Sequence, residues 1–183
     1  MRALPHHFLR LVATVLFTAS LGPLVQLSAQ EATPADGAFA AVELAPGLTA
    51  EVFTAVPTDL APDHTLYTIR FTFQPGSEIA AHSHPGTVSL TVTEGTFGWT
   101  LLEGTATLVR ASASGSPTST EELTEFGVEV LLEPGDAIYY EDDVVHTARG
   151  ASDETTVVYG SLLLETGQPL RIPADMDMAT PAD

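Results

Sequence analysis

Apolar and polar residues alternate along much of the chain between residues 50 and 164, and this alternation predicts β-strands. In residues 66–73, the apolar face of an extended strand carries Tyr67, Ile69, Phe71 and Phe73. In residues 97–101, one face carries Phe97, Trp99 and Leu101. A period of two is typical of a sheet that buries one of its surfaces. No long helical periodicity is present beyond the N-terminal apolar segment.

Ten segments of this kind are rich in Val, Ile, Thr, Tyr and Phe, and Gly, Pro and Asp separate them. They are residues 50–56, 66–73, 79–82, 89–92, 97–102, 105–110, 128–132, 137–140, 145–148 and 156–164. Ten short strands joined by tight turns predict an all-β domain, either a closed barrel or a double sheet. Glu94-Gly95 and Glu103-Gly104 each indicate a hairpin turn. Residues 111–120, which are small and polar, indicate a flexible surface loop.

The N-terminus has the features of an export signal. Arg2 and Arg10 supply positive charge, residues 11–27 are almost wholly apolar or small, and Ala29 marks a plausible cleavage point. An uncleaved anchor is the alternative, although about 17 residues is the lower limit for spanning a bilayer. We therefore expect a signal peptide at 1–29, a linker at 30–45, a barrel domain at 46–171 and a flexible tail at 172–183. The mature protein is then extracellular or in the cell envelope.

The composition narrows the choice of partners. The chain has 24 acidic residues and six basic ones, and its formal charge is −18. Cleavage after Ala29 would remove two arginines and leave four against 24 acids, a charge of −20. Such a surface repels phosphate backbones and anionic lipids, which argues against a nucleic-acid partner and against membrane binding by the cleaved protein. Because the chain has no cysteine, any metal site must use nitrogen and oxygen ligands.

Three histidines carry the candidate chemistry. His82 and His84 are two residues apart, so both imidazoles leave the same face of a strand. His146 lies about sixty residues later and can return beside them on a neighbouring strand. Imidazole is a common ligand of zinc, iron, nickel and copper, so the pattern indicates a metal pocket inside a β-barrel. His64, in the turn-rich sequence Pro-Asp-His-Thr, is expected in a solvated loop.

Two neighbouring features bear on this pocket. Tyr139 and Tyr140 alternate in direction, so one of them alone can face the pocket. Such a tyrosine either packs the barrel or donates a hydrogen bond there. Asp136, directly after Gly135, is expected to fix the turn that enters its strand.

The spacing of these residues resembles the cupin superfamily. Its first motif is a Gly, five residues, His-x-His, a Glu and a later Gly, and it is matched here by Gly76, His82, His84 and Gly95. Its second motif is Gly-Asp followed by a His, and it is matched by Gly135, Asp136 and His146. The resemblance covers roughly residues 66–164. It implies a double-stranded β-helix, or jelly-roll, barrel, and it implies a homodimer because cupin barrels commonly pair.

The chain departs from the cupin pattern at the glutamate that usually joins the metal ligands. With three intervening residues that position is Val88, and with four it is Ser89. Asp143, three residues before His146, is a possible replacement, although it is also ordinary turn chemistry. The resemblance then implies a three-histidine site, as in some cupin dioxygenases, or a vestigial pocket without metal.

Three functions follow from the resemblance. The leading one is an exported protein whose His82, His84 and His146 bind iron, manganese, zinc or nickel, as in a metal-dependent oxidoreductase of the cupin dioxygenase type acting on a small molecule. The second is a barrel that binds a small ligand or a metal without turnover. The third is an interaction protein with a vestigial, metal-free pocket.

Overall fold

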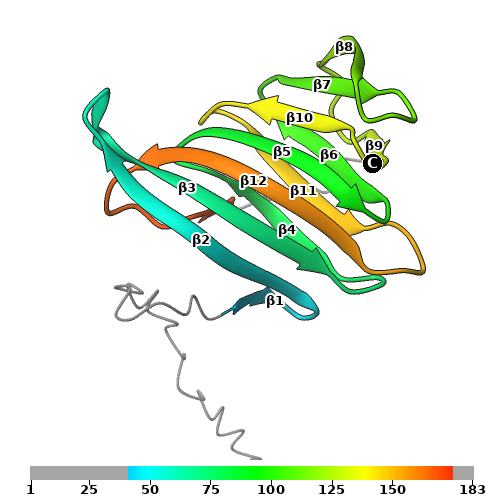
Figure 1. Cartoon of the computed structure of the whole chain (residues 1–183), viewed down its shortest axis with the longest axis horizontal. Coiled ribbons are helices and arrows are strands. Elements are labelled where there is room, and N and C mark those ends of the chain that lie inside the picture. Colours follow the sequence, from blue (N-terminus) through cyan, green and yellow to red (C-terminus); the bar gives the residue numbers. More distant parts are fainter. Residues whose placement is uncertain (1–40, 175–183) are drawn as a thin grey trace, which may run out of the picture. The chain divides into compact units, whose positions relative to one another are not determined.

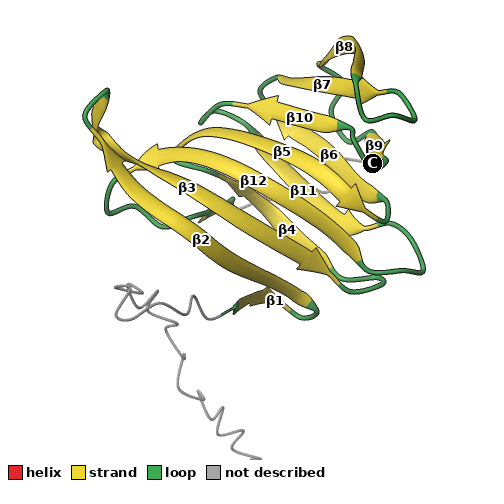
Figure 2. Ribbon diagram, in the orientation of Figure 1, coloured by secondary structure: helices red, strands yellow, loops and turns green. Residues whose placement is uncertain are grey.

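The computed structural model describes residues 41–174, and within them every regular element is a β-strand (Figure 2). The strands are β1 (Val42–Ala45), β2 (Leu48–Thr58), β3 (Ala61–Phe73), β4 (Glu78–Ser83), β5 (Gly86–Glu94), β6 (Phe97–Glu103), β7 (Ala106–Ala111), β8 (Pro117–Leu123), β9 (Glu129–Leu132), β10 (Ala137–Tyr140), β11 (Val145–Gly150), β12 (Thr156–Glu165) and β13 (Ile172–Pro173). The all-β prediction is confirmed. The described part of the chain has no helix that is long and apolar enough to cross a membrane.

The strands form two antiparallel sheets (Figure 1). One has the order β1-β2-β3-β12-β5-β10-β7-β8, and the other has the order β13-β4-β11-β6-β9. Successive strands from β3 to β6, and again from β9 to β12, alternate between the two sheets. The inner rows β3-β12-β5-β10 and β4-β11-β6-β9 are therefore the two four-stranded sheets of a jelly roll. The strand order itself supports the predicted architecture.

The core lies between the sheets and follows the alternation of the sequence. Trp99 and Leu101 on β6 are 0% and 1% exposed, and Ile69 on β3 is 0% exposed. Phe73 on β3 packs against Phe97 on β6, with ring centroids 5.4 Å apart, so the two sheets meet through these aromatic rings. Burying a side chain of this size stabilises the fold by about 1.5–3 kcal/mol.

The glycine turns join different sheets, which corrects the prediction of hairpins. The turn at Gly95 joins β5 to β6, and the turn at Gly104 joins β6 to β7, and each pair of strands belongs to opposite sheets. Gly95 has a φ of +70°, and a Cβ there would lie 2.7 Å from the Thr155 carbonyl oxygen. The turns are therefore placed correctly, but alternation alone does not say which strand pairs with which.

Three short strands extend the sheets where the sequence predicts irregular structure. Residues 111–120 were expected as a loop, yet β8 begins at Pro117 and pairs with β7. It is exposed up to Leu123, so it lacks the apolar alternation that would predict it. The strand β1 lies within the predicted linker and pairs with β2, and β13 lies within the predicted tail and pairs with β4. The predicted signal peptide at 1–29 and residues 175–183 of the tail lie outside the described residues.

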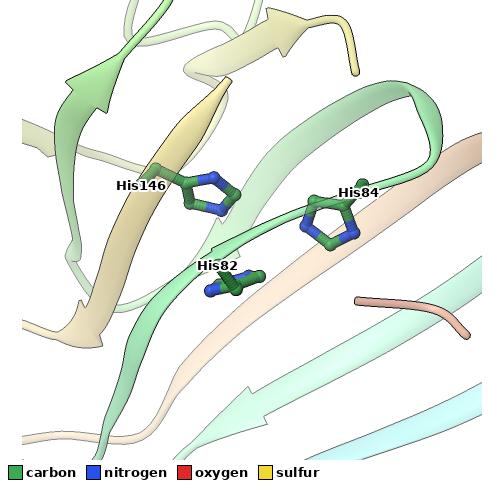
Figure 3. Close-up of side chains that lie close together, drawn as sticks. All are labelled: His82, His84 and His146. Carbon is green, nitrogen blue, oxygen red and sulfur yellow. The ribbon is translucent and has the colours of Figure 1, made fainter. Parts of the chain in front are cut away.

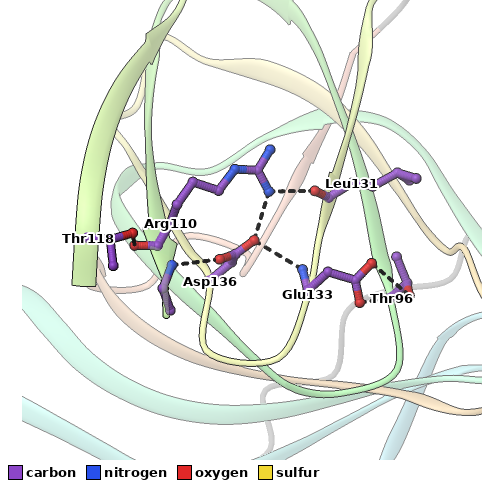
Figure 4. Close-up of polar contacts among 7 residues, drawn as sticks. Thr96, Arg110, Thr118, Leu131, Glu133 and Asp136 are labelled. Atoms are coloured by element: carbon purple, nitrogen blue, oxygen red, sulfur yellow. Dashed lines mark hydrogen bonds and ion pairs between the residues drawn. The ribbon is translucent and has the colours of Figure 1, made fainter. Parts of the chain in front are cut away.

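A carboxylate holds the turn before β10, as predicted for Asp136 (Figure 4). Asp136 accepts hydrogen bonds from the Arg110 guanidinium at 2.7 Å, the Ala111 amide at 2.8 Å and the Glu133 amide at 3.2 Å. Burial would raise the pKa of Asp136, but the Ala111 amide and Arg110 outweigh it and hold that pKa below its usual value. This network anchors the strand that carries Tyr140.

Candidate metal centre

The three predicted histidines meet on the inner face of the smaller sheet (Figure 3). His82 on β4 is the registered partner of His146 on β11, and His84 follows directly after β4. The ring centroids of His82 and His146 lie 4.3 Å apart, and those of His84 and His146 lie 5.4 Å apart. One nitrogen from each ring lies within 4.8 Å of the others. All three side chains are buried, with exposures of 3%, 8% and 2%.

Local backbone structure sets the direction of these rings. The β4–β11 register shifts between His146 and Ala148, and such irregularities re-aim the side chains beside them. His84 lies in the turn from β4 to β5, where its carbonyl accepts the Gly86 amide at 2.9 Å. Gly86 has a φ of +145°, and a Cβ there would lie 2.2 Å from the Leu163 carbonyl oxygen. Glycine is therefore required at this turn, where the chain approaches β12 two residues after His84.

Backbone carbonyls fix the tautomers of two rings. His82 Nδ1 lies 2.8 Å from the Ala80 carbonyl oxygen, and His84 Nδ1 lies 2.6 Å from the Leu170 carbonyl oxygen. A carbonyl accepts and never donates, so Nδ1 carries the hydrogen and Nε2 keeps its lone pair. Metal-binding histidines are characteristically oriented by this bond from the second nitrogen. In His146, Nδ1 is buried without a hydrogen-bond partner.

Burial keeps the rings neutral. It lowers the pKa of His84 to about 4, with a further contribution from His82, and it lowers the pKa of His82. Burial, followed by the two neighbouring histidines, places the pKa of His146 well below its usual value. Neutral imidazole is the form that binds metal, because protonation would occupy the lone pair. At neutral pH the three rings therefore present lone pairs in a buried site.

Val88 stands where the resemblance to the cupin motif predicts a glutamate after three intervening residues. Its side chain is 0% exposed and lines the cavity, whereas Ser89, the next residue on β5, is half-buried and is not among the residues that line it. The three-residue spacing is therefore the one that applies. Asp143 is exposed, and within residues 41–174 the group of potential ligands contains the three histidines alone. The donor set is nitrogen only.

Two aromatic side chains complete the inner surface. The Tyr140 hydroxyl lies 3.3 Å from His146 Nε2, and its side chain is 1% exposed. Burial raises the pKa of Tyr140, so the phenol keeps its proton. Tyr139 points outward and donates to Glu141 at 2.6 Å, as the alternation requires. The Trp99 ring stacks on His146 with centroids 5.2 Å apart, a contact that alternation within β6 does not predict.

The histidines open into a cavity in which the centre of a water molecule can occupy about 50 Å³. Its walls are mostly apolar and come from both sheets, with Phe71, Leu90 and Leu162 among them. Arg171 also lines the cavity, and no motif or periodicity of the sequence predicts this. His64 lies in β3 and not in a loop, and it is half-buried and outside the histidine group.

Several solved structures are similar to this chain. KdgF from Halomonas sp. matches 69% of this chain and 94% of its own, at 17% identity and a TM-score of 0.46. An RmlC-like cupin from Shewanella frigidimarina matches 70% of this chain and 86% of its own, at 16% identity and a TM-score of 0.46. The oxalate decarboxylase formate complex from Lactobacillus farciminis matches 74% of this chain and 33% of its own, at 12% identity and a TM-score of 0.46. No family model and no curated protein matches the chain. The assignment of a jelly-roll fold rests on the strand order.

Proposed function

We propose that this chain is an exported cupin-type protein that binds one divalent transition metal through His82, His84 and His146. The observation that carries the proposal is the convergence of three neutral, buried imidazoles, each of which offers one ring nitrogen within 4.8 Å of the others. Hydrogen bonds from Nδ1 already fix two of these rings, and His146 has an unpartnered buried nitrogen that a metal bond or a small ring rotation would satisfy. A vestigial pocket does not account for the orphan Nδ1 of His146, because a buried polar atom without a hydrogen-bond partner is costly.

The donor set favours some metals over others. Imidazole suits zinc, iron, nickel and copper, whereas manganese prefers carboxylate and water oxygen. With Val88 at the glutamate position, the site is therefore better suited to iron, zinc or nickel than to manganese. Metal–nitrogen bonds are about 2.1 Å long, so two nitrogens on one ion lie at most about 4.2 Å apart. The rings therefore move slightly closer when the ion binds.

We further propose that the bound metal acts on a small molecule held in the cavity. A metal with three protein ligands keeps open positions, where it supplies Lewis acidity or, as iron, oxygen activation. The apolar walls exclude water from these positions. Tyr140 holds a proton beside His146 and offers a hydrogen-bond donor to a bound molecule.

The test is the metal content of protein purified without an affinity tag. Wild-type protein is expected to hold about one equivalent of transition metal, and His82→Ala and His146→Ala less than a tenth. His64→Ala is the matched control, because His64 is half-buried on β3 and lies outside the group. Equal metal content in all four proteins would refute the site. Oxygen uptake by the iron-loaded protein, supplied with candidate small molecules, then separates an enzyme from a binding protein.

A further inference from the structure

The arginines of the described region differ in their partners. Three of them pair with carboxylates: Arg70 with Glu51, Arg110 with Asp136 at 2.7 Å, and Arg149 with Glu129 at 2.6 Å. Arg171 is the fourth, and within residues 41–174 it forms no ion pair. Its guanidinium Nη2 donates instead to the Leu44 carbonyl at 3.2 Å. The chain has 24 acidic residues, so a cation without a carboxylate partner needs an explanation.

Arg171 lies at the candidate metal centre. It follows Leu170, whose carbonyl accepts the hydrogen bond from His84 Nδ1, and it precedes β13, which pairs with β4 beside His82. Among the described residues that line the cavity, it alone is charged. Arg171 therefore adds a positive charge to the wall of the cavity that holds the three histidines.

We propose that Arg171 binds the carboxylate of a small monocarboxylic acid whose apolar body occupies the cavity. A guanidinium forms two parallel hydrogen bonds to a carboxylate, and these bonds are stronger where water is excluded. The apolar walls, including Phe71, Leu90 and Leu162, suit a hydrocarbon or aromatic body. A phosphate dianion fits less well, because a single guanidinium leaves its second charge buried without compensation.

This inference deepens the proposed function, since it names the class of molecule that would lie beside the metal. The carboxylate subsite itself consists of Arg171 and the cavity walls, so it is expected in metal-free protein as well. A bound carboxylate would lie next to His82 and His84, which leaves the apolar body to fill the remaining space. The same molecule would then meet the open positions of the metal.

The experiment measures the affinity of benzoate and hexanoate against benzyl alcohol and hexanol, by calorimetry in the presence of a chelator. Wild-type protein is expected to bind each acid at least tenfold more tightly than its alcohol. In Arg171→Gln the acids should bind about tenfold to a hundredfold more weakly, because charge-assisted hydrogen bonds have this strength, while the alcohols change less than twofold. Arg149→Gln is the matched control, since Arg149 is an ion-paired arginine outside the cavity lining, and it should leave every affinity unchanged.

Four results would overturn the proposal. They are equal binding of acids by wild type and Arg171→Gln, equal weakening by Arg149→Gln, no binding of either acid by wild type, and tighter binding of phenyl phosphate than of benzoate. If Arg171→Gln folds poorly, Arg171→Lys is the second variant. It keeps the positive charge and a hydrogen-bond donor for the Leu44 carbonyl, but it cannot form the bidentate hydrogen bonds of a guanidinium to a carboxylate. It is expected to bind the acids with intermediate affinity, and wild-type affinity would count against a guanidinium subsite.

Metal content, measured on the same variants, separates this proposal from the proposed function. Arg171→Gln is expected to retain its metal while losing the acids. Binding of acids that depends on Arg171, without any bound metal, would support the carboxylate subsite and refute the metal centre. Bound metal, together with an affinity for acids that is the same in wild type and Arg171→Gln, would support the metal centre and refute the carboxylate subsite.

Discussion

Restoring a carboxylate at Val88 should convert the three-histidine centre into a four-ligand site and make the stability of the fold depend on metal. Val88 is fully buried on β5, opposite Tyr140 of β10 and Leu162 of β12. In metal-free Val88→Glu, the histidines of the cavity are neutral and cannot balance the carboxylate, and Arg171, which also lines the cavity, donates to the Leu44 carbonyl. An uncompensated buried charge costs about 3–5 kcal/mol, which lowers the melting temperature by about 10 °C or more in a domain of this size.

Metal should reverse this loss. The new carboxylate places a negative charge against the cation, so affinity for manganese, an oxygen-preferring ion, should rise more than affinity for zinc. At a hundred times the dissociation constant, a ligand that binds the folded state alone stabilises it by about 2.7 kcal/mol. Most of the lost stability should therefore return when manganese is added in excess. Thermal unfolding with chelator and with manganese measures both effects.

Ser89→Glu is the control for this experiment. Ser89 is the next residue on β5 and lies outside the cavity lining, so the same charge added there should alter neither metal affinity nor the response to chelator. Identical behaviour of the two variants, or a Val88→Glu protein that manganese does not stabilise, would show that Val88 does not face a metal site.

Three further predictions concern the groups around the histidines. Trp99 is the single tryptophan of the chain and stacks on His146, so nickel or ferrous iron should quench its fluorescence, whereas quenching that survives His82→Ala would place the metal elsewhere. Because the folded-state pKa of His84 lies below its unfolded value of 6.5, the unfolded state binds more protons between those values, and the metal-free protein should lose stability as pH falls from about 6.5 towards 4. The lowering of the His84 pKa to about 4 corresponds to about 3 kcal/mol in the free energy of unfolding. Urea unfolding in chelator at pH 7 and pH 4.5 measures this loss. Unchanged stability would mean that the ring is solvated. Asp136→Ala should destabilise the fold by about 1–3 kcal/mol in urea unfolding because it leaves two backbone amides without their acceptor, and it should leave metal affinity unchanged; a large loss of metal would contradict its assignment to the turn.

Local pattern predicted much of the fold. Alternation predicted that Ile69, Phe73 and Trp99 lie in the core, where the structure buries them. The two-residue spacing of His82 and His84 predicted that both side chains leave the same face of a strand. It also required that one of Tyr139 and Tyr140 face inward, and the structure assigns this place to Tyr140. These predictions succeed because the direction of a side chain on a strand depends on neighbours in the sequence alone.

Long-range pairing produced the features that the pattern could not predict. The strand β8 is recognised through its pairing with β7, since its own residues are polar and exposed. Arg171 reaches the cavity because β13 pairs with β4, a contact between segments far apart in the chain. The stacking of Trp99 on His146 likewise depends on the register of β6 against β11, which pairs Leu101 with His146. Periodicity within one strand does not predict which strands pair or in which register, so it could not predict these contacts.

The most direct test of the metal centre is a crystal structure of the tag-free protein with anomalous scattering recorded at the edge of the bound metal. We predict a single anomalous peak about 2.0–2.2 Å from one nitrogen of each of His82, His84 and His146, with no carboxylate of this chain among the ligands. A peak at any other place, a carboxylate ligand in addition to the histidines, or no peak after soaking with excess iron, zinc or nickel would contradict a three-histidine centre.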